Sequence, residues 1–378
     1  MKILMAMSGG VDSSVAAFLL KSQGHELIGG MIKMFDTEDI SPEFSHSLEG
    51  GSDSSGGKKS PVSQRSCCTL SDADDARSVA NVLEIPFYVF NFAQNFAEDV
   101  IEKFIRAYER GTTPNPCIDC NRFLKFEKFL RRATELDCDK IATGHYAQIS
   151  ADANGRYLLK CGADETKDQS YVLYAMTQEQ LSRTVFPLGA LKKEEVRALA
   201  EAQGFINAQK RDSQDICFAP DGDYAGFIER RTGQKKGRFI DGSGKILGEH
   251  KGIVHYTIGQ RKGLGISAPR PLFVVAMDAD ENTITLGDDE QLFTNKLLAR
   301  DLNFIPFDKI NAPIKVSAKI RYAHTPEPAT VFQTSEDEIL CEFAKPQRAI
   351  TPGQAVVFYD GDIVVGGATI AAQSVAVK

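Results

Sequence analysis

The sequence predicts an α/β protein in which a Rossmann-like domain with a parallel sheet comes first and two β-rich domains follow. Three observations support this prediction. A glycine turn, Ser8–Ser14, joins an apolar strand to an amphipathic helix. Strand and helix patterns then alternate to about residue 203, which is typical of right-handed βαβ units. From Gln214 onward, short strands and turn pairs such as Asp241-Gly242 replace this alternation.

Length and composition limit the possible classes of protein. The chain has 378 residues, enough for two or three domains, and 42% of them are hydrophobic. A net charge of −7 excludes a globally basic nucleic-acid binder but is compatible with one basic face. Because no signal or transmembrane run is found, we expect a cytoplasmic protein with no membrane partner. We also expect a monomer. In that compartment the 8 cysteines should be reduced.

The Rossmann-like domain is assigned to residues 1–205. Its strands are expected at Ile3–Met7, Leu27–Met34, Ile85–Phe92 and Lys140–Tyr146. Its helices are expected at Val15–Gly24, Ser71–Leu83, Phe96–Arg110, Asn121–Leu136 and Lys192–Gln203. Residues 37–66 are polar and rich in Ser and Gly, so we expect a mobile insertion there.

The two β-rich domains are assigned to residues 206–282, a small central domain, and 283–378. The last domain has six expected strands, at Leu297–Ile305, Ile314–Arg321, Ala329–Thr334, Glu338–Phe343, Ala355–Tyr359 and Ile363–Ile370.

The glycine turn is a candidate phosphate site. Gly9 and Gly10 let the backbone come close to a ligand, and the first N–H groups of the helix point at it. Ser13 and Ser14 add hydroxyl donors, but no Gly-Lys-Ser/Thr of a Walker loop is present. An ordinary strand-to-helix turn is the alternative. Glycines 29, 30 and 144 also lie near strand ends, where ligands bind in such sheets, and are expected to join the site.

Cys117 and Cys120 form a Cys-x-x-Cys after two prolines, and the next helix is expected to begin directly after Cys120, which favours a thiolate there. Three interpretations remain open. Cys120 and Cys217 are a nucleophile and a sulfur carrier, all three cysteines ligate an iron–sulfur cluster, or all three are structural. A zinc ribbon and a thioredoxin-like exchanger fit the spacing poorly. The other cysteines are assigned to packing: Cys67, Cys68, Cys138, Cys161 and Cys341.

Several motifs in a fixed order resemble known enzymes. Ser8–Ser14 is similar to the pyrophosphate loop (PP-loop) of N-type ATP pyrophosphatases. Further blocks resemble the bacterial tRNA-specific 2-thiouridylase family over nearly the whole chain, namely Thr113–Phe126, Ala142–Tyr146, Lys167–Tyr171, Asp215–Phe218, Thr257–Gly265 and Thr351–Gln354. The resemblance implies an adenine nucleotide α-hydrolase domain and a C-terminal β-barrel that binds tRNA.

The resemblance also implies a reaction. ATP adenylates the 2-oxygen of the wobble uridine of tRNA and releases pyrophosphate, a cysteine persulfide or an iron–sulfur cluster delivers sulfur, and AMP leaves. The implied cofactors are ATP and Mg²⁺, with Asp12 as a nearby carboxylate, and possible ligands of a [4Fe-4S] cluster are Cys117, Cys120 and Cys217. A sulfur-donor protein is the implied partner besides tRNA.

Site residues follow from the matching motif positions. The positions that match ATP contacts are Ala6, Met7, Ser8, Gly9, Gly10, Val11, Asp12, Ser13, Ile32 and Gly144. The segment that matches the face toward the target base is Asn115, Pro116 and Cys117. Cys120 matches the nucleophile and Cys217 the persulfide carrier, and the persulfide route ends in a disulfide between them. The positions that match tRNA contacts are His145, Lys167, Asp168, Gln169, Arg321, Tyr322 and Gln354.

This chain departs from the family pattern at Cys117, where many family members have Asp. Relatives with three cysteines resemble cluster-dependent enzymes, so both the persulfide route and the cluster route remain open. Two other functions are alternatives: a PP-loop amide synthetase acting on a small substrate, and a non-catalytic module that senses adenine nucleotides. The basic residues of the Asn121–Leu136 helix suit either phosphate contacts or a solvated helix face.

Overall fold

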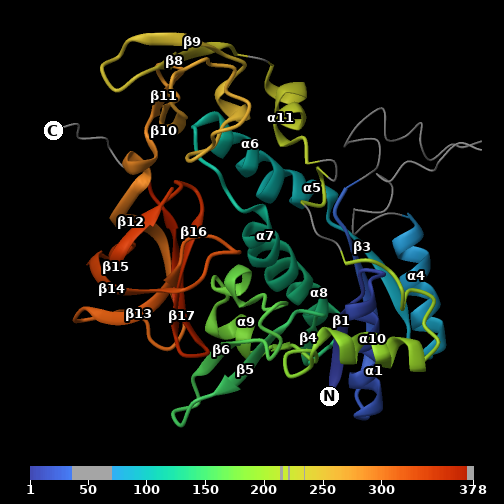
Figure 1. Cartoon of the computed structure of the whole chain (residues 1–378). Coiled ribbons are helices and arrows are strands. Elements are labelled where there is room, and N and C mark those ends of the chain that lie inside the picture. The colour runs from blue at the N-terminus through green and yellow to red at the C-terminus, as the bar shows by residue number, and fades with distance from the viewer. Residues whose placement is uncertain (36–69, 213–215, 220–221, 234, 373–378) are drawn as a thin grey trace, which may run out of the picture. The chain divides into compact units, whose positions relative to one another are not determined.

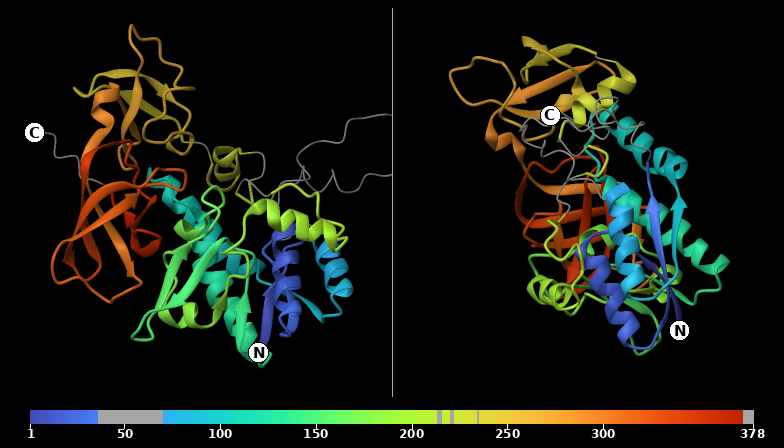
Figure 2. Two further views of the ribbon diagram at one scale, coloured as in Figure 1. Left: turned by 60° about the horizontal axis from the view of Figure 1, so that its bottom comes forward. Right: turned by 90° about the vertical axis from the view of Figure 1, so that its right-hand side faces the viewer.

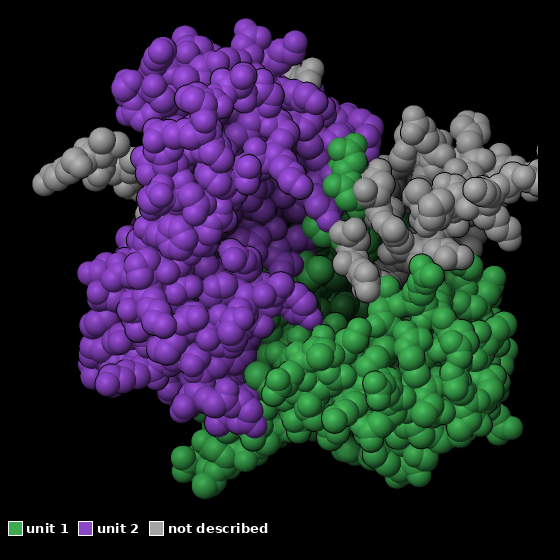
Figure 3. Space-filling view, in the orientation of Figure 1, with its two compact units in different colours: residues 1–100, 117–223 green, residues 101–116, 224–378 purple. Residues whose placement is uncertain are grey.

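The computed structural model describes residues 1–35, 70–212, 216–219, 222–233 and 235–372. Contacts divide the chain into two compact units, coloured separately in Figure 3. Unit 1 comprises residues 1–100 and 117–223, and unit 2 comprises residues 101–116 and 224–378. Residues 206–223, assigned by the sequence to the central domain, thus group with the first unit. The expected insertion, with Cys67 and Cys68, lies outside the described residues.

Unit 1 is built on a five-stranded parallel sheet with the strand order β3-β2-β1-β4-β7 (Figure 1). The strands are β1 (Lys2–Ala6), β2 (Glu26–Lys33), β3 (Phe87–Asn91), β4 (Lys140–Ala142) and β7 (Thr184–Val185). The expected Rossmann-like sheet is therefore confirmed, although the strand expected to reach Tyr146 ends at Ala142.

Helices cover both faces of this sheet. Ile3 and Met5 of β1 point into a core shared with three helices, α1 (Val11–Ser22), α4 (Leu70–Val82) and α10 (Lys193–Ala202). The opposite face carries one long helix made of α7 (Pro116–Asp119), the π-helical η3 (Cys120–Lys128) and α8 (Phe129–Glu135). Smaller elements complete the unit, namely α5 (Ala93–Phe96), η2 (Ala97–Ile101), β5 (Ala147–Ala151), β6 (Tyr157–Cys161), η4 (Ser170–Leu173) and α9 (Gln178–Ser182).

The long helix begins earlier than the sequence predicts. Its first residue is Pro116 rather than Asn121, since proline is well suited to the first helical position. Cys117 therefore lies in the first turn and Cys120 in the second.

Unit 2 contains α6 (Glu102–Glu109) and the two β-rich parts, both visible in Figure 2. The first part is a sheet in the order β10-β11-β8-β9 with two helical elements, and its bounds are α11 (Tyr224–Thr232), β8 (Gly237–Ile240), β9 (Ile246–His250), η5 (Ile253–His255), β10 (Phe273–Asp278) and β11 (Thr283–Gly287). The sequence did not predict α11.

The second part follows η6 (Asp289–Leu292) and is a six-stranded antiparallel barrel. Its strands are β12 (Phe293–Phe304), β13 (Ile314–Lys319), β14 (Glu327–Ser335), β15 (Glu338–Arg348), β16 (Ala355–Asp360) and β17 (Ile363–Ile370). The long strand β12 pairs with both β15 and β17, which closes the barrel and leaves no open edge in this ring. All six expected strands are present. Among the described residues, no helix is long and apolar enough to cross a bilayer.

Gly29 and Gly30 do not approach a ligand as expected. Both lie inside β2, where a Cβ on Gly29 would come within 2.8 Å of the Met7 sulfur and one on Gly30 within 2.9 Å of the rings of Phe90 and Phe129. The two glycines make room for side chains on opposite faces of the sheet, which is a packing role.

Replacing Gly30 with Ala should therefore destabilise unit 1. Overpacking of a filled core typically costs about 1–3 kcal/mol. We expect a lower urea midpoint, measured by circular dichroism. Gly242→Ala is the control, because nothing lies within 4 Å of a Cβ at that position. Equal midpoints for Gly30→Ala and the unchanged protein would contradict the packing role.

Candidate functional site

The turn between β1 and α1 forms an anion-binding geometry. Gly10 is the N-cap of α1, and no side chain caps this helix end. The Ser13 hydroxyl accepts a hydrogen bond from the Ser8 N–H (3.2 Å) and donates one to the Gly10 carbonyl oxygen (3.0 Å). The uncapped N–H groups and the helix dipole favour a negatively charged group at this position.

Two glycines allow the backbones around this turn to come together. A Cβ on Gly9, whose φ is 75°, would lie 2.2 Å from the carbonyl oxygen of Asp72. A Cβ on Gly144 would lie 3.0 Å from backbone atoms of both Asp12 and Ser13. The segment after β4 is therefore packed directly on the first turn of α1, and the nucleotide contact expected at Gly144 stays a prediction.

The back of the turn is held by a segment that the sequence did not single out. The amide of Asn207, which is 3% exposed, donates to the Gly9 carbonyl oxygen (3.0 Å) and to the Ser14 hydroxyl (2.9 Å). Lys210 Nζ contacts the same carbonyl (3.3 Å) and forms ion pairs with the Asp72 carboxylate (2.6 Å) and with Asp75. Ser14 is thus buried behind the turn and is not a ligand donor, contrary to expectation.

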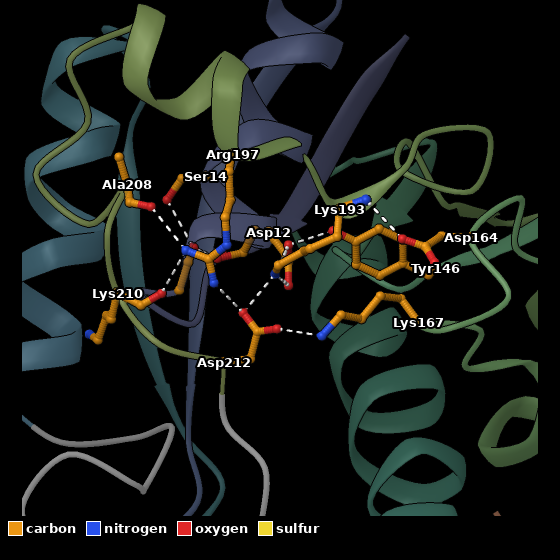
Figure 4. A network of polar contacts seen from close by, with 12 residues as sticks. Asp12, Ser14, Tyr146, Asp164, Lys167, Lys193, Arg197, Ala208, Lys210 and Asp212 are labelled. Atoms are coloured by element: carbon orange, nitrogen blue, oxygen red, sulfur yellow. Dashed lines mark hydrogen bonds and ion pairs between the residues drawn. The ribbon is translucent and has the colours of Figure 1, made fainter. Parts of the chain in front are cut away.

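A charged network lies on the other side of α1 (Figure 4). Lys193 Nζ contacts both carboxylate oxygens of Asp12 (2.7 and 2.8 Å) and one oxygen of Asp212 (2.8 Å). Asp212 also forms ion pairs with Lys167 and Arg197, each at 2.8 Å. Burial raises the pKa of Asp212, but hydrogen bonds from Lys167 and Lys193 outweigh it and hold the pKa at about 2. The network ties α1 and α10 to the segment that leads toward Cys217.

Asp12 does not fit the expected place beside Mg²⁺. Its carboxylate holds the Lys193 ammonium and accepts a hydrogen bond from the Tyr146 hydroxyl (2.7 Å). Burial and the nearby Asp12 carboxylate raise the pKa of Tyr146, so its hydroxyl stays protonated as a donor. A divalent cation at this carboxylate would have to displace an ammonium group, so no step is assigned to a metal here.

Cys120 and Cys117 lie on the same helix in different surroundings. Cys120 is 8% exposed and its thiol contacts the sulfur of Met34 (3.8 Å), whereas Cys117 is exposed. Cys138 and Cys341 are buried, in agreement with their assignment to packing. The described cysteines form no disulfide.

A series of contacts links Cys120 to the segment of Cys217. Cys120 contacts Met34, and the ring of the next residue, Phe35, is 6.1 Å from the ring of Phe96. The Phe96 ring is 5.8 Å from that of Phe218, which follows Cys217 directly. The two cysteine segments therefore belong to one part of unit 1, although they are far apart in the sequence.

The expected cluster ligands are not gathered in this conformation. Within the described parts of the chain, no group of three or more His, Cys, Asp or Glu side chains is arranged to hold a metal ion. The residues present do not form a cluster site here, and no step is derived through one.

The residues expected to contact tRNA in unit 1 hold local structure. His145 is 7% exposed, with its Nδ1 2.7 Å from the Thr143 hydroxyl. The Asp168 carboxylate accepts hydrogen bonds from the N–H groups of residues 162 and 170, and the Gln169 side-chain oxygen accepts one from the Tyr146 N–H (3.1 Å). Lys167 faces Asp212. Their contacts with tRNA stay predictions.

The expected contact residues in unit 2 divide into two groups. Arg321 and Tyr322 are exposed just after β13, and Lys319 Nζ lies 5.8 Å from the Tyr322 ring centre, so an aromatic face and cations are presented together. Gln354 instead donates a hydrogen bond to the carbonyl oxygen of Thr113 (2.7 Å), within the segment that continues to Asn115 and Pro116.

The predicted nucleotide contacts at Met7, Val11 and Ile32 are buried apolar residues, so only their backbones are offered to a ligand. On the long helix, Arg131 and Arg132 form ion pairs with Glu135, which is the surface pattern of a solvated helix face.

Comparison with known proteins identifies the family. Three family models match in order, described as tRNA methyl transferase HUP domain (residues 1–221), tRNA methyl transferase PRC-barrel domain (225–288) and aminomethyltransferase beta-barrel domain (294–370). The tRNA-specific 2-thiouridylase MnmA of Lachnoclostridium phytofermentans is 50% identical over 98% of this chain and 99% of its own length. The chain belongs to the tRNA-specific 2-thiouridylase family. The protein of the same name from Clostridioides difficile is 49% identical over 98% of both chains.

The prediction of the 2-thiouridylase family is thereby confirmed, together with the layout of a nucleotide-type domain, a central domain and a barrel. Sequence reasoning missed Asn207, Lys193 and the role of Asp212. An apolar spacing pattern marks Lys193 and Asp212 only as charged positions, and nothing in Asn207 distinguishes it from a surface amide. Their partners become visible only when distant segments are folded together.

Asn207→Ala should weaken ATP binding, because it removes two hydrogen bonds that hold the Gly9 carbonyl and Ser14 in place. Each such bond is worth about 1 kcal/mol, or roughly fivefold in affinity. We expect a rise of about fivefold or more in the ATP dissociation constant, measured by calorimetry. Gln209→Ala is the control, since Gln209 is exposed nearby and, among the residues that the structure describes, its side chain bonds to Glu201 alone. Unchanged ATP affinity in Asn207→Ala would contradict the view that Asn207 holds the turn in its binding geometry.

His145 should make stability depend on pH. Burial, reinforced by Lys125, holds the pKa of His145 well below its ordinary value. Below about pH 6.5 the unfolded chain binds a proton that the folded chain does not, so stability falls as the pH falls, by up to about 1.4 kcal/mol per pH unit. His145→Asn should reduce this slope between about pH 6.5 and 5 in urea titrations, while His250 and His324, whose pKa values burial also lowers, remain in both proteins. Parallel slopes would refute the assignment.

Proposed function

We propose that this protein is an ATP-dependent tRNA-uridine 2-sulfurtransferase, the activity for which its relatives are named. The observation that carries the proposal is the grouping of three distant segments in unit 1. The uncapped turn at Ser8–Gly10, the Cys120 helix and the Cys217 segment all belong to this one compact unit.

The turn and the start of α1 would hold the phosphates of ATP. Ser8 to Ser13 supply backbone N–H groups and a hydroxyl, while Ile32 and Gly144 lie beside the nucleotide. Attack of the uridine 2-oxygen on the α-phosphorus forms an adenylated uridine and releases pyrophosphate. The uridine oxygen then leaves as part of AMP, which is a far better leaving group than the oxygen alone.

Sulfur reaches carbon 2 from a persulfide on Cys217. The terminal sulfur attacks carbon 2 and AMP leaves, and the Cys120 thiolate then attacks the Cys217 sulfur and breaks the S–S bond of the persulfide. In the variant route, Cys120 first releases hydrosulfide, which attacks carbon 2. Both routes end in a Cys120–Cys217 disulfide, which a thiol reductant must reopen, and both need a sulfur-donor protein to restore the persulfide.

Residues assigned to tRNA contact occur in each of the two units. Asn115, Pro116 and Cys117 face the target base, which must leave its stack to be reached. Further contacts are assigned to His145, Lys167, Asp168, Gln169, Arg321, Tyr322 and Gln354. Mg²⁺ would act on the phosphates of ATP through oxygens other than those of Asp12.

Replacing either Cys120 or Cys217 with Ser should abolish 2-thiouridine formation, with a loss of about a thousandfold or more, as expected for a nucleophile. The assay combines ATP, a sulfur donor and unmodified tRNA, and the nucleosides are quantified by mass spectrometry. Cys138→Ala is the matched control, because Cys138 is buried elsewhere in the same unit. Full thiolation by either Ser variant would refute these roles.

Substitution of Cys117 distinguishes the persulfide route from the iron–sulfur cluster route. The persulfide route should tolerate Cys117→Asp, whereas a cluster held by three cysteines would lose its iron and its activity. The measurement is iron and labile sulfide after anaerobic purification, together with the thiolation yield. An amide synthetase would release pyrophosphate from ATP in the absence of tRNA. A nucleotide sensor would bind ATP and release no pyrophosphate.

A further inference from the structure

The backbone of Thr113 is held on both sides by one loop of the barrel. Its N–H donates to the Pro352 carbonyl oxygen (2.8 Å), and its carbonyl oxygen accepts from the Gln354 side-chain amide (2.7 Å). All of these residues belong to unit 2. Two good hydrogen bonds to one residue fix both its position and its orientation.

Close contact reinforces this hold. Gly353 lies between the two hydrogen-bonding residues with a φ of 89°, and a Cβ there would be 2.9 Å from the Thr113 nitrogen and 3.0 Å from the Thr112 Cβ. Only glycine therefore lets the loop approach so closely. The Thr113 hydroxyl also lies 3.4 Å from the hydroxyl of Thr257 in the central domain.

The barrel loop itself is firmly attached. The Gly353 N–H donates to the Ile370 carbonyl oxygen (2.9 Å), and the Ile370 N–H donates to the Gln354 carbonyl oxygen (2.8 Å). Ile370 is the last residue of β17 and is buried. The loop thus extends the barrel sheet, and the residues that hydrogen-bond to Thr113 are themselves fixed by strand β17.

The held residue is close in sequence to the reactive cysteines. The chain leaves unit 1 after Val100 and returns to it at Cys117, so the excursion ends where the Cys-x-x-Cys begins. Between Thr113 and Cys117 stand Pro114, Asn115 and Pro116, and the fixed φ of the two prolines makes this connection stiff. A displacement of Thr113 is therefore passed on to the first turn of the cysteine helix.

We propose that Gln354 is a positioning residue for the cysteine helix, in addition to its assigned contact with tRNA. The Gln354 side chain anchors Thr113, and the proline-stiffened connection carries that position to Cys117 and Cys120. The inference deepens the proposed function and rests on it only for the catalytic consequence.

The test compares Gln354→Glu with Tyr322→Ala. Glutamate keeps the shape of glutamine and can accept hydrogen bonds from RNA, but its carboxylate cannot donate to the Thr113 carbonyl. Tyr322 is an exposed barrel residue assigned to tRNA and distant in sequence from the anchor. The first readout is the alkylation rate of Cys117 and Cys120 by iodoacetamide without ATP or tRNA, resolved by peptide mass spectrometry. The second is the single-turnover thiolation rate at saturating tRNA.

For Gln354→Glu we expect the alkylation rate of at least one of the two cysteines to change by about fivefold, the effect of one lost hydrogen bond, and the saturated thiolation rate to fall. Tyr322→Ala should weaken tRNA binding and leave alkylation unchanged. Gln354→Met also lacks the donor but adds no charge, and we expect the same changes in alkylation and thiolation from it. It replaces Gln354→Glu in the test if the melting curve shows that Gln354→Glu folds poorly.

Alkylation rates within twofold of the unchanged protein in both Gln354 variants, with thiolation restored by excess tRNA, would overturn the positioning role and leave a tRNA contact only. Failure of the unchanged protein to thiolate tRNA would instead refute the proposed function. Since alkylation needs neither ATP nor tRNA, the two failures are distinguishable.

Discussion

The buried ammonium of Lys193 is the interaction on which the nucleotide unit depends. It lies at the start of α10, is 8% exposed, and forms ion pairs with Asp12 on α1 and with Asp212 on the segment before Cys217. Tyr146, from the turn after β4, completes the group. Removing Lys193 would leave the carboxylates of Asp12 and Asp212 close together without their shared cation, although the partial exposure of both lets water offset some of the cost. Four parts of the chain therefore share one electrostatic requirement, and the anion-binding turn lies at the end of the helix that they hold.

Local rules explain how much of the fold the sequence predicted. The parallel sheet and the barrel strands follow from apolar runs and turn residues, and β17 has the expected bounds Ile363–Ile370. The helix start at Pro116 was missed because the helix was expected to begin only after Cys120, although a proline is well suited to the first helical turn. Gly29 and Gly30 also misled the prediction. A glycine pair indicates close approach, but the sequence does not say whether a ligand or an aromatic ring approaches.

The site was predictable where one segment carries the chemistry and unpredictable where several segments meet. The Ser8–Ser14 turn and the Cys-x-x-Cys are contiguous, so the resemblance located them. Asn207 acts on Gly9 across most of the length of unit 1, and the Gln354 anchor at Thr113 joins residues 241 positions apart. Such pairs carry no local pattern. Asp12 shows the converse error, because a carboxylate beside a phosphate loop suggests a metal, whereas here it is satisfied by an ammonium and a phenol.

The two cysteines on one helix have different surroundings. Cys117 is in the first turn and exposed, and Cys120 is one turn later, buried against the Met34 sulfur. Water would hydrolyse an adenylated base, and solvent oxidants attack exposed thiolates, so a nucleophile for this reaction benefits from a site that excludes both. Cys120 meets that requirement and Cys117 does not. In the proposed reaction the Cys120 thiolate attacks the Cys217 sulfur, so the position of the helix that carries Cys120, and hence of Thr113 just before that helix, bears on the geometry of this step.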